Sequence, residues 1–471
     1  MTRCDSTSAL DFATLLKGPN SSTTADVAPT RWSQLGVSCP AAIVIPSTES
    51  EVIDVLHLAA AKGLQVVPVA GACSPFVRIT GKSLLLDLRN FRDVSVQPGS
   101  VTFGGGSIAG DVIRACAAEQ CYTLTPNSNA VGMVGFLLGG GSSPFNGIHG
   151  LAADSIIELR VITADGRILT LSSSITGAEA RLFRTLRGAG HGLGIITSVT
   201  MPSFPILSLN MTDNCVWVRR VIFPLTAIDE AAMAFLKLQN SISPRLLSSI
   251  MFLRAPSSAP NPGQPAISLT AAYYGPAPEG EKSAAELFDP QLLRHSSAAT
   301  TSMVPLARMN GGAEFLNAVG GYKQLGNALL CDISLESIRQ GAKAWSRFCD
   351  EHQDAETRTI IFWGNWNTAS VRLNMFLPGN DRKGFLQVLV WYTEDDTAEP
   401  ANKFMGDMLC IGRQKDSVNG IVPATFPNNQ LLGGNSKEVF SETAIQEIQQ
   451  VKALWDADGL FWSPVVVTPS D

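Results

Sequence analysis

The stretch that decides the fold is Val131-Gly-Met-Val-Gly-Phe-Leu-Leu-Gly-Gly-Gly-Ser-Ser-Pro-Phe-Asn-Gly-Ile-His-Gly-Leu-Ala-Ala-Asp154. It holds seven glycines and a single carboxylate. Glycine lets a backbone approach a ligand closely and adopt positive φ without steric cost, and neighbouring N–H groups can form a concave anion site. Such a run is typical either of the wall of a large flat cofactor or of tight turns in a sheet domain.

Two further stretches rich in small residues favour the cofactor interpretation. Val69-Ala-Gly-Ala-Cys-Ser-Pro75 follows a predicted strand, where small residues suit a turn that holds a phosphate group. Arg187-Gly-Ala-Gly-His-Gly-Leu-Gly194 is a second glycine-rich loop and leads into a predicted strand over 195–201. Together with the first run, these stretches can supply backbone donors and close apolar walls.

Hydrophobic periodicity predicts a βαβ unit near the N-terminus, with strands over 41–45 and 64–69 that are parallel and a helix over 51–62 between them. After Pro202 to Pro205 the pattern changes to a second α+β region, a sheet backed by helices. Its predicted strands are 215–223, 250–253, 266–274, 359–363, 371–376 and 385–392, and its helices are 229–241 and 335–349. A last helix is predicted over 442–455.

Composition limits the possible partners. The chain has 471 residues and a net charge of −6, without the basic footprint of a nucleic-acid-binding protein, and no apolar run long enough to span a membrane. The nine cysteines are scattered, which predicts neither a disulfide framework nor a metal site. Residues 1–29 lack the apolar core of a signal peptide, so we expect a cytoplasmic protein if Met1 is the native start, and a trimmed start would leave secretion open. The sequence does not indicate an oligomeric state.

In order and spacing, the motifs resemble the FAD-linked oxidases of the vanillyl-alcohol-oxidase (PCMH-type) superfamily, in their berberine-bridge-enzyme-like branch. The similarity covers residues 30–205 and the last fifty residues well, and the middle of the chain loosely. The motifs that carry it are Pro46 with Glu51-Val52, Val69 to Ser74, Leu86-Asp-Leu-Arg89, Val131-Gly-x-x-Gly135, Gly139-Gly-Gly141, Gly150-Leu-Ala-x-Asp154, Ala164-Asp-Gly166, Leu186-Arg-Gly-x-Gly190, Gly194-Ile-Ile-Thr197 and Val451 to Phe461.

The resemblance implies a two-domain α+β fold: a PCMH-type FAD domain over 30–205, an α+β substrate domain over 206–420, and a segment over 421–471 that returns to the FAD domain. It implies FAD as cofactor. The residues expected to bind it are Ala70, Gly71, Ala72, Cys73, Ser74, Val131, Gly132, Gly135, Gly141, Ser142, Gly150, Asp154, Ile196 and Asn428.

Three positions depart from the family pattern. Cys73 stands where relatives carry the histidine that bonds to the flavin, and Ser128 stands where some carry a second, cysteine link. A thiol in an apolar site is mostly protonated, so we expect FAD to be bound without a covalent link. Asn429 stands where many relatives carry a tyrosine that accepts the substrate proton, and an asparagine cannot accept one.

A residue other than Asn429 must then accept the substrate proton. Of the five histidines, His149 and His191 fall inside the glycine-rich loops. A histidine there can transfer a proton at cellular pH or can cap the loop through a backbone hydrogen bond, and of the two we favour His149 as the catalytic group. The aromatic residues Trp363, Trp366, Trp391 and Tyr392 can line an apolar substrate site or belong to the core.

The leading functional hypothesis is an FAD-dependent oxidase of a hydrophobic small molecule in secondary metabolism, with hydride transfer to the flavin and reoxidation by oxygen. The alternative is a non-redox isomerase or cyclase on the same scaffold, with proton transfer by His149 or a pocket that folds the substrate. A protein that only binds its ligand is the third possibility.

Overall fold

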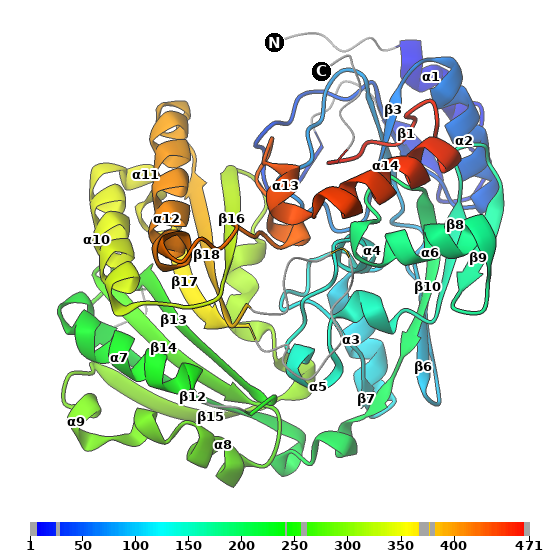
Figure 1. Cartoon of the computed structure of the whole chain (residues 1–471). Coiled ribbons are helices and arrows are strands. Elements are labelled where there is room, and N and C mark those ends of the chain that lie inside the picture. The colour runs from blue at the N-terminus through cyan, green and yellow to red at the C-terminus, as the bar shows by residue number, and fades with distance from the viewer. Residues whose placement is uncertain are drawn as a thin grey trace.

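A computed structural model describes residues 7–24, 29–240, 243–255, 261–366, 376 and 382–465. Three main sheets organise these residues, and Figure 1 shows the first two on one side of the molecule and the largest on the other. The predicted strand over 371–376 lies outside the described residues except for Phe376. Among the described residues, no helix is long and apolar enough to cross a membrane.

The first sheet contains the predicted βαβ unit. Its strand order is β1 (Ser22–Thr24), β2 (Ala42–Ile45), β4 (Ser83–Asp87) and β3 (Gln65–Val69), and β2 and β3 are both parallel to β4, which lies between them. Helix α2 (Glu49–Ala61) begins after Thr48, whose side chain accepts a hydrogen bond from the Glu51 backbone N–H. The loop after β3 therefore leaves the carboxyl end of a buried parallel strand, where ligand sites of such sheets form.

The second sheet is antiparallel throughout. Its order is β5 (Val94–Gln97), β6 (Ser100–Gly104), β10 (Ile195–Pro202), β8 (Glu158–Ile162) and β9 (Ile168–Ser172). Helices α3 (Ala109–Ala118) and α6 (Gly177–Ala189) come from the same part of the chain, and their buried residues join the apolar core that the sheet shares. The second glycine-rich loop enters β10, so this sheet fixes its position.

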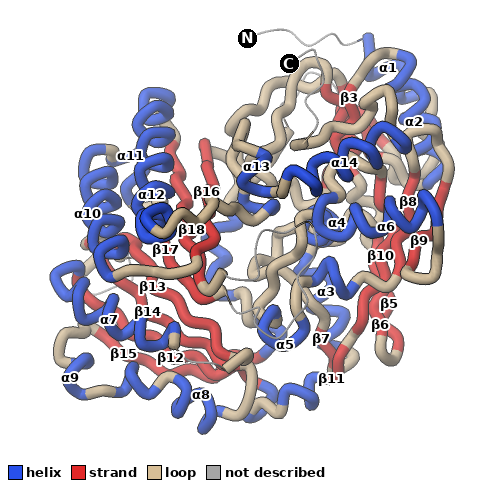
Figure 2. Tube along the Cα trace, viewed as in Figure 1, coloured by secondary structure: helices blue, strands red, loops and turns tan. Residues whose placement is uncertain are grey.

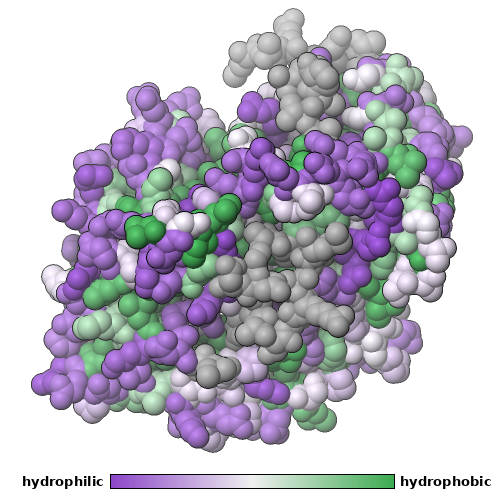
Figure 3. All heavy atoms as spheres, in the orientation of Figure 1, coloured by the Kyte–Doolittle hydropathy of each residue, from purple (hydrophilic) through white to green (hydrophobic). Residues whose placement is uncertain are grey.

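The third sheet has seven antiparallel strands, visible as the broad set of strands in Figure 2. Helices α7 (Ile228–Gln239), α10 (Leu335–Glu351) and α12 (Ala398–Val418) pack on it, and the visible face of the molecule over α10 and α12 is mostly hydrophilic (Figure 3). The strand order is β15 (Ala298–Pro305), β12 (Cys215–Pro224), β14 (Pro265–Tyr273), β13 (Leu246–Arg254), β17 (Ile360–Asn365), β18 (Gly384–Tyr392) and β16 (Tyr322–Leu330).

Side chains alternate between the two faces of this sheet. On β17, Ile361 and Trp363 join the core between the sheet and its helices, whereas Ile360 and Phe362 line a cavity on the opposite face. Sequence patterning did not predict β15, β16 or α12. The side chains of β15 are almost all exposed, and those of β16 are almost all buried. Neither strand therefore shows the alternation that marks a half-buried strand.

The C-terminal residues return to the first sheet. Helix α14 (Glu442–Trp455), the red helix in Figure 1, has the predicted bounds and packs against α6. Beyond it, the Val66 N–H donates to the Leu460 carbonyl and the Trp462 N–H donates to the Val66 carbonyl, which adds the tail to the edge of β3. Both ends of the chain therefore contribute to one structural unit.

The remaining elements are short. The helices and strands are α1 (Thr7–Ala13), β7 (Cys121–Tyr122), α4 (Met133–Leu138), α5 (Asn146–His149), β11 (Phe204–Pro205), α8 (Ala277–Ser283), α9 (Pro290–Leu293), α11 (Gln353–Glu356) and α13 (Ser436–Val439). The 3-10 helices are Ala152–Ser155, Ile206–Leu209, Thr212–Asn214, Leu225–Ala227, Ala285–Phe288, Leu306–Arg308, Gly311–Asn317, Asp395–Thr397 and Pro427–Asn429.

Candidate functional site

A cavity of about 400 Å³ lies between the loops of the first two sheets and the helix-free face of the third. One wall is the loop after β3 together with residues 131–142 and 191–196, and the opposite wall is formed by β13, β16, β17 and β18. Residues 426–429 and Trp462 from the C-terminal part of the chain also line it. The cavity thus collects residues from three distant parts of the sequence.

The loop after β3 has the properties of an anion site. Within the described residues, the N–H groups of Gly71, Ala72, Cys73 and Ser74 donate to no acceptor of the protein. Ala72 has a φ of 53°, in the left-handed region that non-glycine residues rarely adopt. Successive open N–H groups around such a residue form a concave site for an oxyanion, so the loop suits a pyrophosphate group.

Gly71 allows this loop to lie directly against the first glycine-rich run. A Cβ at position 71 would overlap the Ala130 carbonyl oxygen and the Gly132 nitrogen, and a Cβ at Gly132 would meet the Gly71 nitrogen at 2.7 Å. The two backbones are therefore in contact, as two loops that enclose one ligand would be.

Two buried cations lie beside the loop. Arg31 donates to the carbonyls of Ser74 (2.7 Å) and Val77 (3.0 Å), and burial lowers its pKa to about 10. Lys323 donates to the carbonyls of Trp32, Ala318 (2.6 Å) and Gly320 (2.7 Å). Among the described residues, neither has a carboxylate partner. Arg31 lines the cavity, so a bound anion would stabilise its buried charge, whereas Lys323 lies outside the lining and its ammonium donates to three carbonyls.

Cys73 lines the cavity between these cations, and it is a thiol. Its Sγ donates to the Gly71 carbonyl at 3.1 Å, and burial raises its pKa to about 11 in spite of the positive charges of Arg31 and Lys323. The side chain of Ser128, also in the lining, donates to Asn317 at 2.6 Å. Neither position presents an activated nucleophile to a ligand.

Asn428 holds the first glycine-rich run in place. Its Nδ2 donates to the Gly135 carbonyl at 3.0 Å, and its Oδ1 accepts from the Gly141 N–H at 3.4 Å. Asn428 belongs to the returning segment, so a residue far away in the sequence fixes the conformation of the run.

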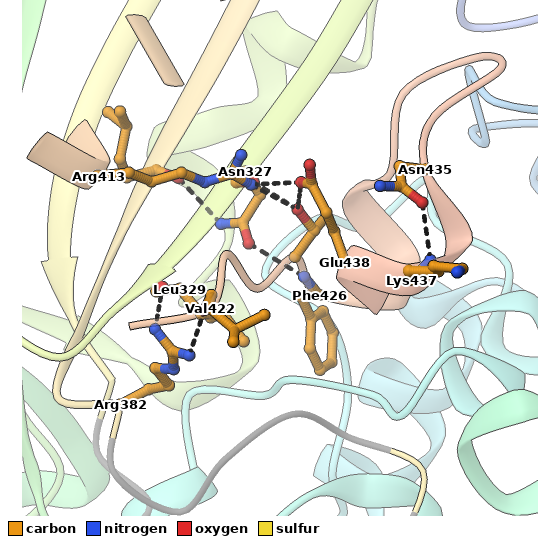
Figure 4. Close-up of polar contacts among 11 residues, drawn as sticks. Asn327, Leu329, Arg382, Arg413, Val422, Phe426, Asn435, Lys437 and Glu438 are labelled. Atoms are coloured by element: carbon orange, nitrogen blue, oxygen red, sulfur yellow. Dashed lines mark hydrogen bonds and ion pairs between the residues drawn. The ribbon is translucent and has the colours of Figure 1, made fainter. Parts of the chain in front are cut away.

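A network around Asn327 on β16 anchors the returning segment (Figure 4). The Asn327 Oδ1 accepts from the Phe426 N–H at 3.2 Å, and its carbonyl accepts from the Thr425 hydroxyl at 3.1 Å. Arg413 of α12 donates to Glu438 at 2.7 Å and to Thr425 at 3.0 Å. These contacts place Phe426 and Asn429 on the cavity wall.

The sheet presents two rows of mostly apolar side chains to the cavity. Antiparallel register places Met251 opposite Phe362, Phe362 opposite Gln387, and Gln387 opposite Asn327. In the second row, Leu389 lies between Ile360 and Leu325. Trp366 and Phe385 add two aromatic rings to the same wall.

His191 is the imidazole that the structure places in the cavity lining. One of its ring nitrogens donates to the backbone of Gly135. The Nε2 atom is buried and has no hydrogen-bond partner among the described residues. Burial lowers the pKa of His191 to about 4, so the ring is neutral at cellular pH.

The structure corrects the placement of His149. It lies outside the cavity lining, in an aromatic cluster where its Nε2 lies 2.8 Å from the Tyr122 hydroxyl and its ring stacks on Phe204 with centroids 3.9 Å apart. Burial and the nearby Arg245 lower its pKa. The short helix α5 turns the histidine away from the glycine residues beside it in sequence, so geometry gives it no role on a ligand in the cavity.

Most of the predicted cofactor-binding residues line the cavity, and so does Asn429, which has no ionisable group. Gly141 lies next to the lining residue Ser142, and its N–H donates to the Oδ1 of Asn428, which does line the cavity. Gly150, with a φ of 80°, ends α5, and Asp154 lies 3.7 Å from Arg187. The lining residues among the predictions are Ala70, Gly71, Ala72, Cys73, Ser74, Val131, Gly132, Gly135, Ser142, Ile196 and Asn428.

The structure divides the four aromatic residues between the alternatives that the sequence left open. Trp366 lines the cavity, whereas Trp363 and Tyr392 belong to the helix-side core and the Trp391 ring lies under the Lys323 ammonium at 3.9 Å. Sequence reasoning missed Arg31, because nothing in a lone arginine of a polar segment points to a cofactor. It also missed Met251 and Leu325, which the strand period could have indicated.

Comparisons with known proteins agree with this geometry. Residues 40–172 match the FAD binding domain family model. The chain is 24% identical over 450 residues to the FAD-linked oxidoreductase hasG of Aspergillus fumigatus, with 91% of this chain and 92% of that protein covered.

Two solved structures share the fold. Physcomitrella patens BBE-like 1 has a TM-score of 0.78 at 14% identity, over 97% of this chain and 100% of that one. The Acremonium strictum glucooligosaccharide oxidase, whose structure reveals a novel flavinylation, has a TM-score of 0.70 at 19% identity, over 91% of both chains. The open N–H groups of residues 71–74 and the Arg31 guanidinium in the lining fit the diphosphate of an FAD molecule in the cavity.

Proposed function

We propose that this chain, which belongs to the berberine-bridge-enzyme-like branch of the FAD-linked oxidases, oxidises an apolar, ring-containing small molecule. It is an FAD-dependent oxidoreductase, and when bound the cofactor supplies the hydride acceptor and passes the electrons to oxygen. The residues of the chain bind and orient the two molecules and keep water out of the space between them.

The observation that carries the proposal is the apolar wall of the third sheet. Met251, Phe362, Ile360, Leu389 and Leu325 stand side by side there. The side-chain amide of Asn327 is already hydrogen-bonded within the protein, since its Nδ2 donates to the Leu386 carbonyl and its Oδ1 accepts from the Phe426 N–H. A sugar chain would leave most of its hydroxyl groups against hydrocarbon, and unpaired buried polar groups are unfavourable. We therefore place the substrate among aromatic or polycyclic molecules instead of oligosaccharides.

We also propose that the cofactor is held without a covalent link. The support is chemical: the Cys73 thiol is protonated at cellular pH because burial raises its pKa to about 11, and the thiolate is the reactive form. The open N–H groups of residues 71–74 and the Arg31 guanidinium supply the binding energy that a covalent link would otherwise add.

The test is anaerobic reduction of the purified yellow protein. Aromatic alcohols and polycyclic phenols are compared with cello- and chito-oligosaccharides as reductants, and the flavin absorbance is followed before and after air is admitted. We expect bleaching by members of the first group and recovery in air. Bleaching by oligosaccharides alone would refute the substrate class, and a protein that binds no flavin would refute the function.

A pair of variants tests whether the substrate binds against the apolar wall of the third sheet. Phe362→Asn replaces an apolar side chain of the first row with an amide, whereas Phe362→Leu keeps position 362 apolar. We expect Phe362→Asn to raise KM for the apolar reductant about tenfold or more, since burying a polar group without a partner costs roughly 1–3 kcal/mol, and Phe362→Leu to stay within about threefold. Equal KM values in the two variants would remove this wall from the substrate site.

One observation favours a redox-neutral alternative. Among the described residues, the cavity lining contains no aspartate, glutamate, tyrosine or lysine that could accept a proton from an alcohol. A pocket of this kind can also fold a flexible apolar substrate for isomerisation or cyclisation. A product of unchanged mass, formed without oxygen and without flavin bleaching, would support this alternative.

A further inference from the structure

We propose that the outer edge of β15 is a dimerisation surface, at which two copies of this chain pair through their β15 strands in antiparallel orientation. β15 is the end strand of the seven-stranded sheet (labelled in Figure 1), and it pairs with β12 over its whole length of eight residues without a register shift. The proposal concerns assembly, so it holds whatever the substrate is and however FAD is held.

The outer edge of β15 offers a row of open backbone groups. In an antiparallel pair, alternate residues of a strand direct their N–H and C=O groups away from the partner strand. On β15 these outward groups bond to no described part of the chain. All its side chains except that of Val304 are exposed, so the strand is accessible from both faces of the sheet. Such an edge is a template to which a further β-strand can be added.

The opposite edge of the same sheet is covered by other parts of the chain. On β16, the Leu329 N–H donates to the Ala424 carbonyl at 2.8 Å, and the Ser33 hydroxyl bonds to the N–H and the carbonyl of Lys323 at 2.9 Å each. The returning C-terminal segment and the N-terminal segment therefore occupy that edge. Of the two ends of this sheet, β15 is the one that can accept a further strand.

β15 also lacks the features that normally protect an edge strand. Soluble proteins place a charged side chain, an internal proline or a bulge on a long exposed edge. Residues 296–307 contain no charged side chain, and the proline of β15 stands at its last position. The end strand of the second sheet, β9, shows the contrast, because it has five residues and is preceded by Asp165 and Arg167. The edge of β15 is thus both longer and uncharged.

The lack of charge favours a second copy of this chain as the partner. The chain has a net charge of −6, so two copies repel each other where acidic surfaces meet. Pairing of β15 with itself brings only uncharged residues together, and the hydroxyl groups of Thr300 and Ser302 can bond across the pair. A peptide that is recognised by its charge finds no complementary group on β15. Because the contact is the same on both copies and the β16 edge is covered, assembly stops at two chains.

Exposed apolar side chains beside β15 would extend the contact. Thr301 accepts from Arg219 at 3.1 Å, and the Arg219 guanidinium lies over the Phe288 ring at 4.2 Å from its centroid. Phe288 is 37% exposed, and Met303, on the same face of the strand as Thr301, is 39% exposed. A second copy that continues the sheet covers these side chains as well as the backbone edge, which brings the contact toward the roughly 1,000 Å² of a stable interface.

The test is the oligomeric state of the purified holoenzyme, measured by sedimentation velocity over a range of concentrations. The double variant Thr300→Lys with Ser302→Lys places like charges on both sides of the contact. The control, Gln449→Lys with Ala453→Lys, adds the same charge to the exposed surface of α14. None of these four residues lines the cavity, so bound flavin per chain shows whether each variant is folded.

We expect wild type and the α14 variant to be dimers. We expect the β15 variant to dissociate, with the dimer dissociation constant raised at least about hundredfold, since like charges brought together at an interface are strongly unfavourable. Its flavin content should be unchanged. A monomeric wild type, or a folded β15 variant that dimerises like wild type, would overturn the proposal and leave the proposed function intact.

A second measurement needs no variant. Amide hydrogen exchange of the wild-type holoenzyme is followed by mass spectrometry on both sides of the dimer dissociation constant. We expect peptides that contain residues 298–305 to exchange more slowly in the dimer, because the outward N–H groups become bonded. Peptides from β9 serve as the control. Equal exchange of residues 298–305 in monomer and dimer would place the interface elsewhere and overturn the proposal.

Discussion

At the scale of single residues, the proposal that FAD is held without a covalent link depends on Cys73. Burial raises the pKa of its thiol to about 11, and the thiol donates to the Gly71 carbonyl. We expect acid precipitation to release all the flavin into the supernatant, and Cys73→Ala to keep at least about half of the bound FAD. Absorption spectra of supernatant and pellet check both. A yellow pellet in wild type that becomes colourless in Cys73→Ala would show a cysteinyl link instead.

His191 also predicts a dependence of stability on pH. Its pKa is about 4 in the folded protein against 6.5 for an ordinary histidine, so the unfolded chain binds more protons between these values. Stability from this group is therefore complete above about pH 6.5 and is lost as the pH falls toward 4. Between pH 7 and pH 5 the loss is roughly 2 kcal/mol.

Urea unfolding of the flavin-free protein at these two pH values measures the loss, and His191→Gln is the control because it cannot titrate. We expect the wild type to lose about 2 kcal/mol more than the variant over this interval. The same loss in both proteins would show that other groups account for the acid sensitivity.

At the scale of elements, the contact between loop 70–74 and residues 130–132 requires Gly71. A Cβ there would overlap backbone atoms of Ala130 and Gly132, which cannot move as a flexible side chain could. We expect Gly71→Ala to lower the free energy of unfolding by roughly 1–3 kcal/mol and to weaken FAD binding by at least about tenfold.

Gly81→Ala is the matched control, because a Cβ at position 81 meets nothing within 4 Å. Denaturant unfolding and FAD titration of the two variants should therefore differ clearly. If Gly71→Ala binds FAD like Gly81→Ala, close approach of the two loops is not needed for the cofactor.

At the scale of the whole molecule, the cavity depends on the C-terminal tail. The Lys452 ammonium donates to the Gly192 and Phe461 carbonyls at 2.7 Å each and pairs with Asp456, and both charged side chains are buried. The Asp456 carboxylate accepts from the N–H groups of Leu460 (2.8 Å) and Phe461 (2.9 Å). This cluster ties the second glycine-rich loop to the tail that carries Trp462.

We expect Asp456→Asn to destabilise the protein by roughly 3–5 kcal/mol, because it leaves the Lys452 charge buried without its partner, and to weaken FAD binding. Asp458→Asn, at an exposed position two residues away, should stay within about 0.5 kcal/mol. Thermal unfolding with and without FAD makes the comparison. An Asp456→Asn protein with unchanged FAD affinity would show that the tail stabilises the fold without shaping the site.

The sequence by itself determined the βαβ unit, the loop after it and the glycine-rich walls, because strand and helix periods and the need for small residues near a ligand are local properties of the chain. It also indicated FAD, through the order of the motifs in residues 30–205. Only the tertiary structure decided which histidine faces the cavity. His149 and His191 lie in similar glycine-rich loops, and the direction of each ring depends on the packing of α5 against Tyr122 and Phe204 in one case and on contacts with Gly135 and Phe76 in the other. The apolar wall of the third sheet was likewise hidden, since its rows form across four strands whose register no single segment specifies.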